Sequence, residues 1–326
     1  MAINRKQFLE IAVTGGMGAF LGGAALLPGR WREKGVSLTS VHRRSLVMGS
    51  IISFQVIAES EEEGYEAIRR AEQAFRTLEK TFSMYDSDSE MARLTRQAGR
   101  EAMTVTEESR RLLHFAKEVH QASEGRFDIT IEPAMRRWGF RETPSEPVKR
   151  PGDRELRKIE RLIGSEKIEL EGGRVMLAEA GMAIDTGGIA GGYALDKALE
   201  VMKQTDVAAG FINFSGDIHC FGKPLDQQKW TVHLLNPETK EPVREPVELV
   251  NEALSTSGAY QNRRYDESDH SWGHLLLPDR AKPAEPVGSV TAVHASAMVA
   301  DAWSTAAYLG AAAPEEVRTI VLTDRG

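Results

Sequence analysis

Two pairs of glycines interrupt residues 182–196, which read Met-Ala-Ile-Asp-Thr-Gly-Gly-Ile-Ala-Gly-Gly-Tyr-Ala-Leu-Asp. The apolar residues before the first pair predict a strand, and the residues after the second pair predict the start of a helix. Glycine lets the backbone turn sharply between the two. A glycine bend at a helix N-terminus presents backbone amides that suit phosphate groups. The segment therefore predicts an anion-binding turn in the middle of the chain.

A carboxylate and a hydroxyl lie four residues apart near the end of the chain, at Asp301 and Thr305. The surrounding residues 296–309 are Ala-rich and periodically apolar, so they predict a helix on which both side chains share one face. Two hard oxygen donors without His or Cys favour Mg²⁺ over a transition metal. Alone, such a pair is more typical of a solvated helix face. Together with the glycine bend, it predicts a metal-assisted site for a phosphate-bearing ligand.

The composition suits a globular fold and argues against some functions. The 326 residues are 41% hydrophobic, which is enough for one large domain or two modest ones. The formal net charge of -7 argues against a nucleic-acid-binding surface. Cys220 is the only cysteine, so the chain has neither an intrachain disulfide nor a cysteine-rich metal site.

The N-terminal segment is similar to an export signal. Arg5 and Lys6 precede an apolar stretch at residues 11–27, which is the order of the basic and hydrophobic regions of a signal. The following Phe-Leu makes it resemble a twin-arginine signal in which Lys6 replaces the second Arg. We expect residues 1–35 to be signal and linker, either removed or retained as an anchor. Residues 36–326 would then form one domain outside the cytoplasm, in the periplasm or cell envelope.

Helical and strand patterns alternate irregularly along the rest of the chain. Because regular β-α-β alternation is missing, the pattern favours an α+β fold over a doubly wound parallel sheet. The predicted helices cover residues 61–82, 107–123 and 153–164, and the predicted strands cover residues 45–58, 211–214, 230–235, 289–293 and 319–323, with a glycine-turn hairpin at 168–177.

Two hydrolase signatures do not account for the motifs. Asp185-Thr186-Gly187 spells the triplet of aspartic proteases, but the chain has no second copy, and the triplet leads directly into a glycine-rich helix start. Thr256 and Ser257 suggest a serine nucleophile only weakly, because no Gly-x-Ser-x-Gly elbow is present. Neither signature explains why acidic and hydroxyl residues recur together.

Six motifs follow one another in a distinctive order. They are Met48-Gly49-Ser50; Phe-Ser-Met-Tyr-Asp-Ser-Asp-Ser-Glu-Met-Ala-Arg-Leu at 82–94; Gly-Arg-Phe-Asp-Ile-Thr at 125–130 with Trp-Gly-Phe at 138–140; the glycine segment at 184–196; Ser-Thr-Ser-Gly at 255–258; and Asp-Ala-Trp-Ser-Thr at 301–305. In this order and spacing the chain resembles the ApbE family, the FAD:protein FMN transferases, over nearly all of its length after the signal.

The resemblance implies a single-domain α+β fold in which mixed or antiparallel sheets, flanked by helices, enclose a flavin cleft. It also implies Mg²⁺ as cofactor and FAD as substrate. Members of the family cleave the FAD diphosphate, attach FMN to a Thr or Ser of a target flavoprotein and release AMP, whereas some hydrolyse FAD to FMN and AMP. Typical targets are subunits of membrane redox complexes, with acceptor sequences of the type Asp-Gly-x-Thr/Ser-x-Ala-Thr.

The same resemblance assigns roles to individual residues. Asp301, Thr305 and the backbone carbonyl of Gly188 would hold Mg²⁺. Asp301 and His274 would be catalytic, since a histidine near neutrality could activate the attacking hydroxyl. The residues matching positions that contact FAD are Met48, Tyr85, Arg126, Phe127, Asp128, Asp185, Gly191 and Leu275.

The chain departs from the family pattern at several positions. Gly191 replaces the usual Lys of the glycine turn, and Leu277 replaces an acid that follows His274 in the family. Ser215-Gly216-Asp217 stands where the family often has Gly-Gly-Asp. Three hypotheses stay open: an FMN transferase, an FAD pyrophosphatase, and a flavin-binding protein without turnover. The target, the oligomeric state and the choice between Mg²⁺ and Mn²⁺ stay open too.

Overall fold

The computed structural model describes residues 31–33, 36–141, 147–259 and 262–323. Most of the expected signal, residues 1–30, lies outside the described residues. Within the range expected to be signal and linker, Trp31–Glu33 forms a short strand, β1, that pairs with β2. In the described part of the chain, no helix has the length and apolar character needed to cross a membrane.

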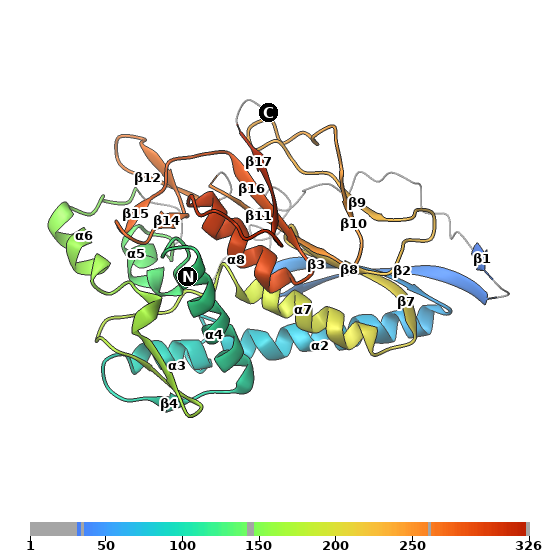
Figure 1. Ribbon diagram of the computed structural model, residues 1–326, viewed down its shortest axis with the longest axis horizontal. Coiled ribbons are helices and arrows are strands. Elements are labelled where there is room, and N and C mark those ends of the chain that lie inside the picture. Colours follow the sequence, from blue (N-terminus) through green and yellow to red (C-terminus); the bar gives the residue numbers. More distant parts are fainter. Residues whose placement is uncertain (1–30, 34–35, 142–146, 260–261, 324–326) are drawn as a thin grey trace.

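An eight-stranded antiparallel sheet runs through the molecule in the order β1-β2-β3-β7-β8-β11-β16-β17 (Figure 1). The predicted strand at 45–58 is wrong as a single strand: it contains a hairpin that turns at Met48 and Gly49, which have φ angles of 47° and 70°. The strands predicted at 211–214, 230–235, 289–293 and 319–323 are present, the second as a shorter strand. The bounds are β2 Val36–Val47, β3 Ser50–Ala58, β7 Val207–Phe214, β8 Asp217–Phe221, β11 Ala253–Gly258, β16 Ser289–His294 and β17 Arg318–Leu322.

Three helices cover one face of this sheet, which we call the helix face (Figure 1). They are α2 Glu61–Phe82, α7 Ala190–Lys203 and α8 Ala297–Tyr308. A capping box between Ser60 and Glu63 starts α2, as its sequence predicts. The buried stripes of all three helices pack on inward residues of the strands, such as Phe54 and Ile212, to form the main core.

The opposite face of the sheet, the far face, is covered only in part. A small hairpin of β9 Trp230–Val232 and β10 Val247–Leu249 lies over it. Trp230 packs on Phe211, with ring centroids 5.2 Å apart, in a second core that includes Cys220, which is a buried thiol. The far face beyond this hairpin is polar.

A smaller helical region adjoins the end of the sheet (Figure 1). Trp138 links it to the later hairpins, because its Nε1 donates to Ala281 O at 2.8 Å and its ring lies 5.2 Å from that of Trp272. The elements are α3 Glu90–Arg96, β4 Met103–Thr104, α4 Glu107–Ala122, η1 Ile129–Ile131, α5 Glu132–Arg137, α6 Asp153–Glu160, η2 Ser165–Lys167, β5 Ile168–Glu171, β6 Arg174–Leu177, β12 Arg263–Tyr265, β13 Ser271–Gly273, β14 Leu276–Leu277 and β15 Lys282–Pro283.

The strand predicted before the glycine bend is absent, and this prediction was wrong. Residues 182–186 join no sheet, and α7 begins only at Ala190. The segment is held by individual hydrogen bonds instead of a strand ladder: Asp185 N donates to Ile129 O at 2.7 Å, and Ile184 N donates to Thr95 Oγ1 at 3.2 Å. The apolar residues are buried between the helical region and the main core, which explains their hydrophobicity without a strand. The α+β class itself is confirmed.

Candidate functional site

The structure brings the glycine bend and helix α8 together. Gly192 N donates to Asp301 Oδ2 at 3.0 Å, although the two residues are 109 positions apart. Further along α8, a methyl group added at Gly188 would lie 3.2 Å from Thr305 Oγ1. The bend and the carboxylate–hydroxyl pair of α8 therefore meet at one place, as the combined motifs predict.

Helices α7 and α8 cap each other. Asp301, on α8, accepts from an amide in the first turn of α7. Asp196, on α7, accepts from Ser296 Oγ at 2.5 Å and from the first amides of α8, Ala297 N at 2.6 Å and Met298 N at 3.1 Å. A carboxylate at a helix N-terminus satisfies free amides and complements the helix dipole. These reciprocal bonds fix how the two helices lie relative to each other.

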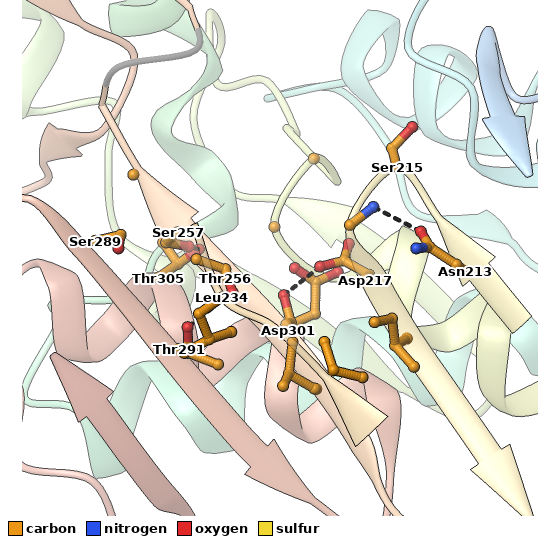
Figure 2. A pocket seen from close by; sticks show the side chains of 18 of the residues that line it. Asn213, Ser215, Asp217, Leu234, Thr256, Ser257, Ser289, Thr291, Asp301 and Thr305 are labelled. Carbon is orange, nitrogen blue, oxygen red and sulfur yellow. Dashed lines mark hydrogen bonds between the residues drawn. The ribbon is translucent and has the colours of Figure 1, made fainter. Parts of the chain in front are cut away.

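A second carboxylate, Asp217, lies beside Asp301 (Figure 2). It begins β8 and accepts from Ser255 Oγ at 2.6 Å. Asp217 keeps some surface toward the cavity but is surrounded by protein, so burial raises its pKa to about 6. Burial, and then the charge of Asp217, raise the pKa of Asp301 well above its ordinary value. Sequence reasoning noted Asp217 only as part of a variant motif and gave it no role.

Hydroxyl groups surround the two acids. Ser257 Oγ lies 3.1 Å from Thr305 Oγ1 and 2.8 Å from Ser304 Oγ, and Ser304 Oγ donates to Asp301 O. This donor set consists of hard oxygens, which Mg²⁺ prefers. Burial and mutual repulsion disfavour ionisation of both carboxylates, and a divalent cation would remove that penalty. The described residues therefore fit a magnesium ion held by Asp301 and Thr305 with Asp217 nearby.

The acids open into a large cavity with a volume of about 1530 Å³. Two predicted residues do not line it. Met48 packs against the main core at the β2–β3 turn, and Gly191 lies just behind Asp301, where an added methyl group would be 3.6 Å from Oδ2. The predicted residues that do line the cavity are Tyr85, Arg126, Phe127, Asp128, Asp185, Gly188, His274, Leu275, Asp301 and Thr305.

Arg141 is a site residue that the sequence did not reveal. Its Nη2 donates to Asp185 Oδ2 at 2.5 Å and to Glu132 Oε2 at 2.6 Å, and Asp185 Oδ1 accepts from Gly187 N at 2.7 Å. Met84 contacts the same guanidinium through its sulfur, 3.9 Å away. Arg141 thus joins α5, the loop before Tyr85 and the glycine bend at the cavity wall. No motif marks it, because its partners lie on other segments.

We expect Arg141→Met to destabilise the fold by about 3 kcal/mol, because it leaves Asp185 buried without its cation and removes one of the two arginines that pair with Glu132. FAD binding should weaken with it, since the bend loses its brace. Arg141→Lys is the matched control: it keeps the charge but not the two-pronged geometry, and should have an intermediate effect. Urea unfolding and flavin-fluorescence titration measure both. Wild-type stability in Arg141→Met would contradict the bracing role.

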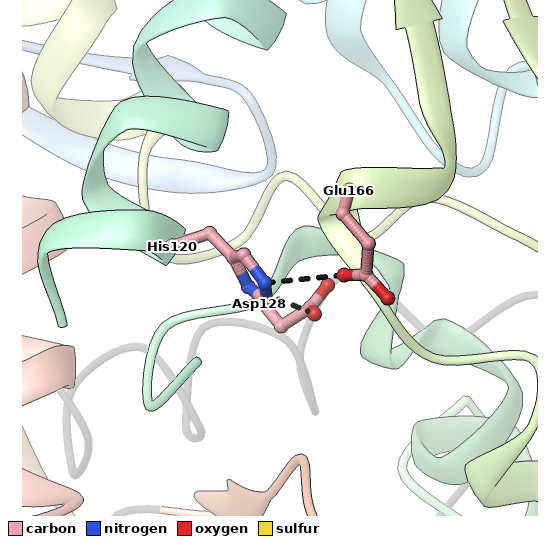
Figure 3. A group of neighbouring side chains, drawn as sticks. All are labelled: His120, Asp128 and Glu166. Atoms are coloured by element: carbon pink, nitrogen blue, oxygen red, sulfur yellow. Dashed lines mark ion pairs between the residues drawn. The ribbon is translucent and has the colours of Figure 1, made fainter. Parts of the chain in front are cut away.

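Asp128 uses its carboxylate to hold the protein together. The carboxylate accepts from Thr130 N at 2.8 Å and from Ser165 Oγ at 2.7 Å, and it pairs with His120 at 3.1 Å. Glu166 flanks the other side of the His120 ring, 3.2 Å away (Figure 3). Burial opposes ionisation of Asp128, but His120 and these bonds outweigh it and lower its pKa. We therefore assign Asp128 the role of shaping the wall beside Phe127, with its carboxylate engaged internally.

His274 lies on the Asp185 side of the cavity. Its ring is edge-on to Phe140, with centroids 6.3 Å apart, and burial lowers its pKa below the ordinary value. The imidazole is therefore neutral near pH 7 and able to accept a proton. Leu275 beside it is buried, whereas Tyr85 is 76% exposed at the cavity wall and offers a flat ring for stacking.

Comparison with known proteins identifies the family of this chain. The sequence pattern of the ApbE family matches residues 48–321. The chain belongs to the ApbE family. The FAD:protein FMN transferase of Vibrio cholerae is 26% identical over 225 residues, which cover 68% of this chain and 67% of that protein. The FAD:protein FMN transferase of Haemophilus influenzae is 24% identical, with 83% and 78% covered.

Solved ApbE structures share the fold. The crystal structure of the ApbE protein of Thermotoga maritima matches with a TM-score of 0.78 and 24% identity, covering 88% of this chain and 95% of that one. The flavin transferase ApbE of Vibrio cholerae matches with a TM-score of 0.73 and 22% identity, covering 88% and 98%. The fold predicted from the family motifs is therefore confirmed.

Proposed function

We propose that this ApbE-family chain is an exported, Mg²⁺-dependent FAD:protein FMN transferase whose acceptor is a Thr or Ser of a flavoprotein subunit in a membrane redox complex. One observation carries the proposal: Asp301 and Asp217 meet the glycine bend at a cavity large enough for a dinucleotide. The names of the relatives support the same activity. The basic and apolar N-terminal segment supports export to the periplasm or cell envelope.

The reaction joins an acceptor hydroxyl oxygen to the FMN phosphorus while the bond from that phosphorus to the bridging oxygen breaks, and AMP leaves. Asp301 and Thr305, with Gly188 alongside, would hold Mg²⁺, which would neutralise charge on the diphosphate. The glycine bend orients the phosphates at the start of α7. Such transfers depend mainly on positioning and charge.

Other residues contact the rings of FAD or accept the proton of the attacking hydroxyl. Tyr85, Phe127 and Leu275 offer flat or apolar surfaces for the isoalloxazine or adenine ring. His274, neutral at pH 7, takes the proton of the attacking hydroxyl. Water at the same position would instead give FMN and AMP, so hydrolysis is the alternative outcome of the same site.

The decisive experiment incubates the purified chain with FAD and Mg²⁺, with and without an acceptor domain carrying Asp-Gly-x-Thr-x-Ala-Thr. Mass spectrometry of the acceptor and chromatography of the nucleotides are the readouts. Covalent FMN on the acceptor supports transfer. FMN and AMP formed equally without acceptor would replace transfer by hydrolysis. FAD that stays bound and intact in both samples would leave a flavin-binding role only.

Magnesium should stabilise the fold more at high pH than at low pH. The raised pKa values of Asp217 and Asp301 mean that the folded state binds protons more tightly than the unfolded state. The stability that these two carboxyl groups contribute in their protonated form is therefore lost as pH rises from about 4 through about 6 and above. The ionised acids then bind Mg²⁺, which adds about 2.7 kcal/mol at one hundred times its Kd. Thermal unfolding at pH 5 and pH 8, with and without Mg²⁺, measures this. An equal magnesium effect at both pH values would contradict the assignment.

A further inference from the structure

The far face of the sheet changes from apolar to polar along four of its strands, in staggered rows: Ser53 and Asn213 stand level with Leu254 and Val293. On each of these strands an apolar residue of the second core is followed, two residues along, by one with a hydroxyl or amide group; the polar residues line the cavity, and so do Phe211 and Leu254. The change runs from Ile57 to Gln55 and Ser53 on β3, from Phe211 to Asn213 on β7, from Leu254 to Thr256 on β11, and from Val293 to Thr291 on β16. We call the polar part, Ser53, Gln55, Asn213, Thr256 and Thr291, the far-face groove.

The groove's polar side chains are aligned by the strand register. Ser53 stands opposite Asn213, and Thr256 stands opposite Thr291 with hydroxyl oxygens 2.8 Å apart. Thr291 is only 1% exposed. A sheet face that contacts other protein is normally apolar, and buried hydroxyls need partners. Within the protein, Gln55 donates to Ser40, Asn213 accepts from Gly216 N, and the two threonines bond to each other. Because amides and hydroxyls can each make further hydrogen bonds, this uncharged cavity wall suits a hydrogen-bonding ligand.

The groove connects with the acid pair through an opening in the sheet. β8 pairs with β11 only at His219–Ala253 and Ile218–Leu254, whereas β11 continues to Gly258. Beyond this point, the side chain of Asp217 joins the two strands by accepting from Ser255 Oγ and from the backbone amide of Thr256. Asp217 and Asp301 on the helix face and Asn213 and Thr256 on the far face consequently line one cavity (Figure 2).

The cavity is larger than the usual small-molecule site. Small-molecule sites measure about 300–1,000 Å³, and this cavity measures about 1530 Å³. The residues matched to FAD contacts, such as Tyr85, Asp185 and Leu275, come from the helical region and the later hairpins, not from the far face. The surplus volume thus includes the groove on the other side of the acids.

We propose that the far-face groove binds the acceptor segment of the target protein in an extended conformation, with its Thr or Ser hydroxyl delivered to the acid pair. This inference rests on the proposed transferase function. In-line transfer needs the nucleophile to approach opposite the leaving AMP, and the groove reaches the acids from the far face of the sheet. Uncharged hydroxyls and amides match main-chain groups of an extended peptide.

The test fills the groove without touching the acids. Ser53→Phe places a ring on the far face of β3, and Ser37→Phe on β2, at an exposed position that does not line the cavity, is the matched control. We expect Ser53→Phe to lower kcat/KM for the acceptor domain at least ~10-fold through steric exclusion, with FAD affinity changed less than about twofold and Ser37→Phe behaving as wild type. Unchanged kcat/KM, or an equal loss of FAD affinity, would overturn the proposal.

A binding measurement separates this proposal from the proposed activity. Calorimetry of the FAD-loaded chain with the same acceptor domain reports docking even without turnover. If the wild-type chain binds the acceptor domain and Ser53→Phe does not, the groove proposal is supported even when no flavin is transferred. Absence of flavin transfer would count against the transferase assignment and not against the groove. No docking to the wild-type chain overturns the groove. Thr256→Val, which removes one hydroxyl at nearly constant shape, should weaken docking about threefold to tenfold; no weakening in either variant counts against the proposal.

Discussion

Asp301→Asn should lower FAD turnover by about 100-fold to 1,000-fold, the scale of losing one charged group that stabilises a transition state. The amide oxygen of Asn can still accept from Gly192 N, so the cap on α7 survives while the negative charge is lost. Steady-state formation of FMN and AMP, with and without acceptor domain, measures the change. FAD binding should persist, because other segments supply the ring contacts.

The stability of the same variant gives an independent readout. At pH 8 Asp301→Asn replaces a buried carboxyl group, whose pKa is raised by burial, with a neutral amide of similar shape, so the metal-free protein should be at least as stable as wild type. Its stabilisation by Mg²⁺ should disappear. Asp301→Ala, which also removes the cap, should be less stable than Asp301→Asn. Wild-type turnover, or a full magnesium effect on unfolding, would remove Asp301 from the metal site.

Gly192→Ala should destabilise the protein by about 1–3 kcal/mol, the usual result of forcing atoms into a packed interior. An added methyl group at this position would lie 2.3 Å from Ala297 O and 2.8 Å from Asp301 Cβ. Helices α7 and α8 would have to separate, and the carboxylate of Asp301 would move with them. Activity should therefore fall with stability.

The neighbouring glycine provides the control. At Gly191 an added methyl group meets Phe214 at 3.4 Å and Asp301 Oδ2 at 3.6 Å, which are ordinary contacts. Gly191→Ala should therefore be neutral or stabilise α7 by up to about 1 kcal/mol. Urea unfolding of both variants measures the contrast. Similar stability of the two variants would show that the close approach of the helices is not what requires Gly192.

The sequence alone was sufficient for the longer helices and several strands, but it did not predict α3, α5, β11 or most of β2. The apolar stripe of α2 and its capping box, and the Ala-rich run of α8, are local patterns that predict local structure. The order of the motifs was enough for the α+β class and the family. The sequence was insufficient at residues 182–186, where a buried apolar segment has the same composition as a strand. It was also insufficient at Met48, where no typical turn residues mark the hairpin turn.

The sequence by itself determined which segments are helical, which are apolar, and that an acid and a hydroxyl share one face of α8. Only the tertiary structure placed Asp217 against Asp301, tied Arg141 to Asp185, and joined the far-face groove to the acids. The physical reason is the separation along the sequence over which each kind of interaction acts. Periodicity and capping act over a few residues, whereas these contacts join residues tens of positions apart and exist only when packed helices and an interrupted strand ladder bring them together.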